Sequence, residues 1–204
     1  MNDKIGNNDS DRYLVDKVLG GDTNAFGIIV KNTEGLVAQI VFKMINNAEN
    51  RKDIAQDIYM KAFKNLSGFK YQSKLSTWIG KIAYNTCLND CEKRKLVLIE
   101  NVHENSETDK KAAQTNENSA FSCYDNESEN VLIRKELSQI LNSEIERLQP
   151  VYKTLITLYH NEELSYEEIA QITTLPEGTI KNYLFRARKM LKESLLLNYK
   201  REEL

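Results

Sequence analysis

Apolar residues recur every three to four positions along most of this chain, and that spacing predicts helices. The predicted helices are, approximately, 11–20, 22–32, 33–45, 51–66, 76–95, 131–148 and 151–162, followed by a helix-turn-helix. Gly20-Gly21 and Asn46-Asn47 mark two of the joints, because glycine and asparagine favour turns. With only 2 Pro and 8 Gly in 204 residues, the chain has little turn-rich sheet character. We therefore predict an all-α protein.

The segment from Leu164 to Leu191 is predicted to form the helix-turn-helix. Ser165 followed three residues later by Glu168 is the capping-box pattern that opens a short helix. Thr173-Thr174-Leu175 interrupts that helix, and Pro176 stands where a second one begins. Two helices joined by so short a turn are typical of a DNA-binding motif.

The second helix of this motif is predicted to have one apolar and one basic face. At 100° per residue, one side collects Ile180, Leu184, Ala187 and Leu191. The opposite side carries Lys181, Asn182, Phe185, Arg186, Arg188, Lys189 and Lys192. Between 179 and 192 five residues are basic and none is acidic, although the whole chain has a formal charge of only −2. A merely solvated face accepts cations but gains nothing from a phenyl ring, whereas a DNA groove offers thymine methyls to Phe185.

Residues 96–130 are predicted to be a flexible linker between two helical domains. The span holds eight acidic residues against two lysines, with many Asn and Ser and few large apolar side chains. Such a composition cannot bury enough surface to order itself. The predicted architecture is thus two small helical domains, 1–95 and 131–204, joined by an acidic tether.

Aromatic and basic residues are interleaved near the end of the first domain. The segment G-F-K-Y-Q-S-K-L-S-T-W brings Phe69, Tyr71 and Trp78 among lysines, and residues 61–95 carry eight basic residues against two acids. On the helix that follows, Trp78, Lys81 and Asn85 fall on one side. Single-stranded nucleic acid needs flat faces for its bases and positive charge for its phosphates. Core packing explains the aromatics equally well, because a small helical domain needs Phe and Trp inside.

The predicted helix 51–66 has an apolar stripe and a polar face. The stripe consists of Ile54, Ala55, Ile58, Ala62, Phe63 and Leu66. The outward positions are Asp53, Gln56, Asp57, Lys61 and Lys64. By residue type alone, this is what any solvated helix face carries.

Several function classes are disfavoured by composition. The N-terminus lacks the apolar stretch of a signal peptide and no run of about 18 apolar residues occurs, so we expect a cytoplasmic protein. Three cysteines do not suggest a disulfide framework, and with two histidines far apart in sequence we expect no metal site. No catalytic constellation or phosphate-cradling glycine loop is present, so we expect neither an enzyme, a cofactor nor a small-molecule substrate.

In order and spacing, these elements resemble the sigma factors of bacterial RNA polymerase, in the extracytoplasmic-function (ECF) group of the sigma-70 family. Region two of that group is similar to D-x-x-L-V-x-x-V-L-x-G-D-x-x-A-F at 11–26, D-I-A-Q-D-I-Y-M-K-A-F at 53–63 and S-T-W-I-G-K-I-A-Y-N at 76–85. Region four is similar to L-S-Y-E-E-I-A at 164–170 and P-E-G-T-I-K-N-Y-L-F-R-A-R at 176–188. Each piece alone is moderately specific, whereas all of them in this order form a strong signature.

The resemblance implies a subunit that binds core RNA polymerase and directs initiation by recognising and opening promoter DNA. It implies that the polymerase clamp helices dock on Asp53, Gln56 and Asp57. It implies that residues 69–74 form the loop that accepts a base flipped out of the minus-ten element, with contacts from Phe69, Lys70, Tyr71 and Gln72. It implies that the path of the opened strand is lined by Trp78, Lys81 and Asn85. The residues implied to meet the minus-thirty-five element are Lys181, Asn182, Phe185, Arg186, Arg188 and Lys189. The group also implies an anti-sigma factor as a partner, and an acidic linker that lies toward the RNA exit path.

The chain departs from the group at a few positions. The flipped-base loop usually shows Arg-Gly-Glu after its Phe, where this chain has Lys70-Tyr71-Gln72, so the base preference there is open. Asn182-Tyr183 replaces the common Ser-Arg, Gln149-Pro150 replaces a proline pair, and Arg51-Lys52 stand where acids often occur. None of these changes interrupts a predicted helix.

Two other functions fit parts of the sequence. A helix-turn-helix repressor or activator would bind duplex DNA independently, with the first domain sensing a ligand or dimerising. Such a domain does not need a net charge of +6 with clustered aromatics at 61–95. A purely protein-binding mimic of a sigma factor would have a neutral second helix, which this chain does not.

Overall fold

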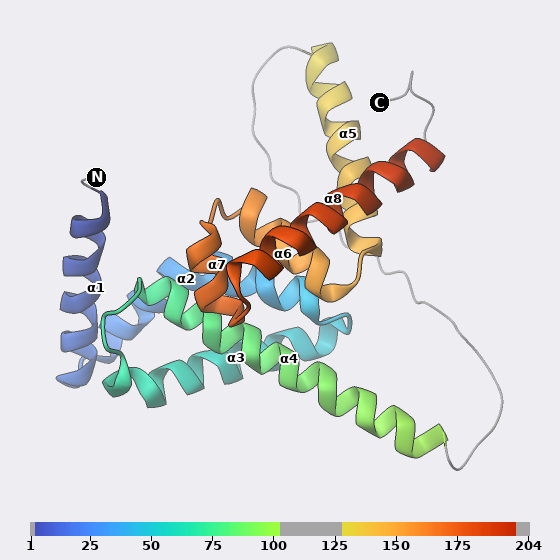
Figure 1. The fold of residues 1–204 in the computed structure, drawn as a ribbon. Helices are drawn as coiled ribbons and strands as arrows, with labels where there is room; N and C mark the ends of the chain where they lie inside the picture. Colours follow the sequence, from blue (N-terminus) through green and yellow to red (C-terminus); the bar gives the residue numbers. More distant parts are fainter. Residues whose placement is uncertain (1–2, 103–127, 199–204) are drawn as a thin grey trace.

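The computed structural model describes residues 3–102 and 128–198, and every regular element in them is helical (Figure 1). The elements are α1 (Asp3–Leu19), α2 (Thr23–Met44), α3 (Ala48–Asn65), a 3-10 turn η1 (Leu66–Gly68), α4 (Leu75–Val102), α5 (Ser128–Arg147), α6 (Pro150–His160), α7 (Tyr166–Thr173) and α8 (Glu177–Asn198). Within this part of the chain the all-α prediction is confirmed.

The predicted joint between residues 32 and 33 is wrong, because α2 runs unbroken through it. Asp22 caps the helix by accepting the Asn24 N–H at 2.9 Å. Thr33, predicted to begin a new helix, is buried in the middle of α2. Its hydroxyl donates to the Ile29 carbonyl at 2.8 Å and lies 3.1 Å from the Tyr59 hydroxyl. A threonine whose polar atom is satisfied within the helix does not end it.

Helix α2 is also long and apolar enough to cross a membrane, and it is the one such helix in residues 3–102 and 128–198. Core helices of soluble proteins meet the same criterion. Here Ile29, Val37, Ile40 and Val41 are buried to 2% exposure or less, and the helix packs against α4 and α6. The apolar character of α2 therefore matches its position at the centre of the helical assembly.

The predicted tether is shorter at both ends than the sequence indicated. Helix α4 continues to Val102, seven residues beyond its predicted end, and α5 begins at Ser128. The apolar run Leu96–Ile99 carries the helix onward, since adding a residue to an existing helix is easier than starting one. The remainder of the tether, 103–127, lies outside the described residues.

Helices α1–α4 form one group and α5–α8 a second, and the two groups pack against each other, with α6 against α2 and α7 against α4 (Figure 1). Gly80 permits the close approach of α4 and α7: a Cβ atom there would lie 3.1 Å from Cδ1 of Ile172. Ion pairs join the same groups, one between Lys74 and Glu168 at 2.9 Å and one between Lys43 and Glu146. Sequence periodicity predicted the two groups but not this docking.

Candidate nucleic-acid interface

The helix-turn-helix forms as predicted. The Glu168 N–H donates to Ser165 Oγ at 3.2 Å and the Ser165 N–H donates to the Glu168 carboxylate at 3.0 Å, which completes the capping box. Thr174 ends α7 in the left-handed conformation, with φ 59°. Helix α8 begins at Glu177, directly after Pro176.

Both predicted faces of α8 are confirmed. The apolar face is buried: Ile180, Leu184 and Ala187 have no exposed surface and Leu191 is 7% exposed. The opposite face is solvent-accessible, and its exposed residues are Lys181, Asn182, Phe185, Arg186, Arg188, Lys189 and Lys192. Phe185 is 68% exposed in the middle of this cationic surface. The ring thus lies exposed among cations, as the sequence predicted, and its contact with DNA stays a prediction.

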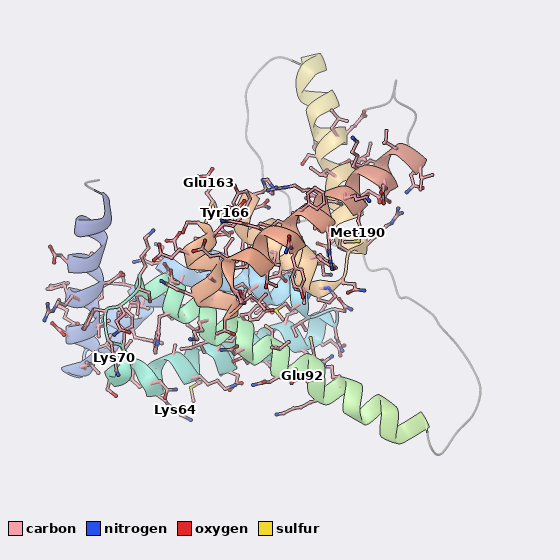
Figure 2. All side chains as sticks on the ribbon, in the orientation of Figure 1. Lys64, Lys70, Glu92, Glu163, Tyr166 and Met190 are labelled. Atoms are coloured by element: carbon pink, nitrogen blue, oxygen red, sulfur yellow. The ribbon has the colours of Figure 1, made fainter. Side chains whose placement is uncertain are left out.

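Two cations of this face are held against neighbouring aromatic rings. Lys181 Nζ lies 5.3 Å from the Tyr166 ring centroid, and Arg188 Cζ lies 5.2 Å from that of Tyr159. Arg188 also lies 3.2 Å from His160 Nε2, and burial together with this cation lowers the pKa of His160. Figure 2 labels Tyr166, at the start of α7, and Met190, in the C-terminal half of α8. Arg188 is thereby directed toward α6, at the edge of that face.

Acidic residues on either side of the acid-free stretch 179–192 partly neutralise its positive charge. Glu177 pairs with Lys181 and Glu193 pairs with Lys189, both at 3.8 Å. Exposed pairs at this distance contribute little to stability, so a phosphate can displace either carboxylate at small cost. The face remains available to an anionic partner.

The aromatic segment before α4 divides into a buried and an accessible part. Phe69 is only 6% exposed, with its ring centroid 4.8 Å from that of Tyr71 and 5.4 Å from that of Trp78. The ring of Phe69 is therefore packed in the core in this conformation, and its role as a DNA contact stays a prediction. Lys70 and Gln72 are exposed, and Tyr71 is half-buried.

Tyr71 stands where the resembled group has glycine, and its φ is 56°. This left-handed conformation suits glycine and is unfavourable for a tyrosine. Its hydroxyl donates to Asp16 at 3.4 Å, and Arg12 Cζ lies 5.5 Å from the ring centroid. The contacts of Tyr71 with Arg12 and Asp16 come from α1, and the local sequence pattern did not predict them.

On α4, the predicted row of Trp78, Lys81 and Asn85 is accessible along one side. Lys81 is exposed, and the other two are half-buried. Gly80 and Tyr84 are buried next to this row, and Gly80 faces Ile172 of the docked helix-turn-helix. The row therefore borders the docked helices and remains accessible.

The polar face of α3 is largely as predicted. Asp53, Gln56 and Asp57 are exposed. Lys61 is an exception: it is half-buried, pairs with Asp57 at 2.7 Å and donates to the Thr86 hydroxyl at 3.3 Å. The exposed face thus presents two carboxylates and an amide, with exposed Lys64 at its C-terminal end.

Two apolar residues of α3 differ from the predicted pattern. Phe63, expected in the buried stripe, is 46% exposed and packs edge-on against Phe26, with ring centroids 5.0 Å apart. Met60, which the pattern did not single out, is 51% exposed. Helical spacing could have found it, because Met60 lies three and four residues beyond Asp57 and Gln56 on the same side.

The described residues contain no group of three or more His, Cys, Asp or Glu placed to hold a metal ion. Cys87 is buried, and burial, with the nearby Cys91 and Asp90, raises its pKa to about 12. A thiol this far from ionisation is a packing residue rather than a nucleophile or ligand. Cys123 and His103 lie outside the described residues.

Comparison with known proteins agrees with this geometry. Residues 29–97 match the family described as Sigma-70 region 2, and residues 138–191 match Sigma-70, region 4. The RNA polymerase sigma-H factor of Pseudomonas aeruginosa is 30% identical over 188 residues, covering 92% of this chain and 94% of its own. The chain belongs to the sigma-70 family. It is a sigma factor of the ECF group, a regulatory subunit that binds core RNA polymerase and directs promoter-specific initiation.

Further relatives are consistent with this assignment. The ECF RNA polymerase sigma-E factor of Escherichia coli is 32% identical over 182 residues, covering 89% of this chain and 92% of its own. A solved structure of the sigma factor RpoE with the anti-sigma factor NepR from Bartonella quintana has a similar fold, with a TM-score of 0.61 and 21% identity. The similarity covers 85% of this chain and 98% of that one.

Proposed function

We propose that this sigma factor divides polymerase binding and promoter recognition between three surfaces. Residues 1–95 act as region two, which docks on core polymerase and opens the minus-ten element, residues 96–130 act as the linker, and residues 131–204 act as region four. The observation that carries the proposal is their separation: carboxylates and an amide on α3, aromatics and cations near the start of α4, and cations on α8. A carboxylate face and two cationic faces suit different partners.

The minus-thirty-five element is assigned to the exposed face of α8. Lys181, Asn182, Phe185 and Arg186 lie in its N-terminal half, the part of a recognition helix that enters the major groove. An arginine there can contact a guanine through two hydrogen bonds, and Phe185 can meet a thymine methyl. Lys189 lies further along and is assigned to the phosphate backbone, whereas Arg188 reaches the same backbone only by leaving Tyr159.

The minus-ten element is assigned to the loop around Tyr71 and to the row Trp78, Lys81 and Asn85. Half-exposed rings beside exposed cations suit an unstacked strand, and base–aromatic stacking contributes about 1–3 kcal/mol per base. Lys70 and Gln72 complete the loop surface. Phe69 supports the loop from the core.

The polymerase clamp helices are assigned to Asp53, Gln56 and Asp57, with exposed Met60 and Phe63 at the apolar edge of the same face. The protein acts in the cytoplasm with core polymerase, without chemistry, cofactor or small-molecule substrate of its own. A solved sigma factor of similar fold is bound to an anti-sigma factor. By extension, we propose an anti-sigma factor as a partner of this chain.

Run-off transcription with bacterial core polymerase tests these roles, with permanganate footprints reporting strand opening. Tyr71→Ala and Asn85→Ala should impair opening while core binding is unchanged. Lys81→Ala should weaken opening more than Lys93→Ala, which removes an exposed cation further along the same helix. Normal opening by the Tyr71 and Asn85 variants would make these residues structural. Tight, specific duplex binding by the free protein, unchanged by core polymerase, would favour an independent DNA-binding regulator.

A further inference from the structure

Tyr71 holds an unfavourable backbone conformation in the middle of the minus-ten loop. Three non-glycine residues in the described chain have positive φ: Tyr71 at 56°, Glu163 at 52° and Thr174 at 59°. Thr174 ends a helix, where the left-handed conformation is common. Tyr71 ends no helix, so its conformation is maintained by the contacts of its side chain.

Those contacts come largely from α1. Arg12 and Asp16 lie one helical turn apart, the guanidinium 5.5 Å from the ring centroid of Tyr71 and the carboxylate accepting its hydroxyl at 3.4 Å. Phe69 packs beneath the ring at a centroid distance of 4.8 Å. The side chains in Figure 2 show the neighbouring Lys70 beside α1.

A second contact from α1 fixes the other end of the loop. Asp11 Oδ2 accepts the backbone N–H of Leu75 at 2.9 Å, where α4 begins. A carboxylate at a helix start satisfies a free N–H and interacts favourably with the helix dipole. Helix α1 therefore holds the loop both at Tyr71 and at its junction with α4, so the path between these points has little freedom.

We propose that Arg12 and Asp16 on α1 are positioning residues of the minus-ten site, which hold Tyr71 so that its ring faces the unstacked base. This inference rests on the proposed role of the loop. Glycine would adopt the left-handed conformation without strain, so a tyrosine at this position indicates that the ring itself is used. Arg12 is exposed, and its guanidinium lies over that ring. Base choice at this position then depends on α1 as well as on the loop.

The experiment uses holoenzyme reconstituted from core polymerase and the full chain, on promoters randomised across the minus-ten element. Tyr71→Gly should weaken strand opening about tenfold, the size of one lost stacking contact, and should also change base preference at one position. Arg12→Ala and Asp16→Ala should change preference at that same position by about threefold or more. In a Tyr71→Gly background neither should have a further effect. Lys17→Ala, an exposed change on α1 whose cation lies over Tyr13, is the matched control.

The outcomes separate this inference from the proposed function. If Tyr71→Gly shifts preference and the α1 variants do not, α1 only anchors the loop and the inference is wrong. If neither Tyr71→Gly nor Asn85→Ala alters preference or opening, the minus-ten assignment itself is wrong. Thermal unfolding is measured on every variant to show that it is folded. Tyr71→Phe removes only the hydroxyl that donates to Asp16, so it should reproduce the change in base preference caused by Asp16→Ala.

Discussion

Gly80→Ala should show whether the helix-turn-helix is docked on α4 in the free protein. In a helix interior, alanine is favoured over glycine by about 0.8–1 kcal/mol. Against this, the added Cβ would lie 3.1 and 3.2 Å from Cδ1 and Cγ1 of Ile172 and 3.3 Å from Cδ2 of Leu36. Overpacking of this kind costs about 1–3 kcal/mol. Because the contacts come from both α7 and α2, the methyl has no free side to move toward, and we expect a net loss of about 1 kcal/mol.

The partner variant is Ile172→Val, which removes the nearest atom, Cδ1. Alone it should cost about 0.5–1.5 kcal/mol, since Ile172 is fully buried. Together with Gly80→Ala it should cost less than the sum, with a coupling free energy of about 0.5–1 kcal/mol. Gly35→Ala is the matched control, because a Cβ at this position of α2 meets no atom within 4 Å. It should stabilise the protein without coupling to Ile172→Val.

The assay is denaturant unfolding of the single and double variants, accompanied by fluorescence transfer between labels on α3 and α8. Equal stabilisation by Gly80→Ala and Gly35→Ala, with no coupling to Ile172→Val, would refute the docked arrangement. Transcription adds a functional readout. The two promoter elements are about 25 base pairs apart, or about 85 Å at 3.4 Å per step, whereas a folded chain of this length has a radius of gyration of about 17 Å. We therefore expect the interface to open in the holoenzyme, so Gly80→Ala should leave transcription intact.

Three further predictions concern charge. Asp53→Lys or Asp57→Lys should weaken the affinity for core polymerase, measured by fluorescence anisotropy, at least tenfold. The unfolding midpoints should stay nearly unchanged, because both positions are exposed. An unchanged affinity would show that this face is not part of the core-binding surface. Arg186→Ala should cost about 1–3 kcal/mol and relax preference at one minus-thirty-five position, whereas Lys189→Ala should weaken all promoters alike and reduce the salt slope by about one unit; a uniform loss for Arg186→Ala would assign it to the backbone. Burial acts to raise the pKa of Glu146, but the hydrogen bonds and charges of Lys43 and Lys153 outweigh it and hold that pKa below 4.5. Its stabilising contribution is therefore present above pH 4.5 and lost as the pH falls through the depressed value, so Glu146→Gln should be less stable than the native chain at neutral pH and equal to it in acid.

Local features of this sigma factor followed from the sequence alone. The capping box at Ser165, the turn before Pro176 and the two faces of α8 were all predicted, because each depends on residues within about one or two helical turns of one another. The family followed from the same short motifs in order. The polar side of α3 was likewise predicted from spacing, apart from exposed Phe63 and half-buried Lys61.

Tertiary contacts decided the features that spacing left open. Phe69 is core because Trp78 and Tyr71 close over it, and Tyr71 is left-handed because α1, more than fifty residues earlier, holds its ring. Helix α2 is continuous at Thr33, whose hydroxyl donates to the Ile29 carbonyl one turn earlier and also lies against the hydroxyl of Tyr59 from α3. The docking of α7 on α4 depends on a missing side chain at Gly80 facing Ile172, a pair 92 positions apart. Helical periodicity reports which side of each element is apolar; which partner covers that side is set by long-range packing, where one methyl group changes the free energy by about 1 kcal/mol.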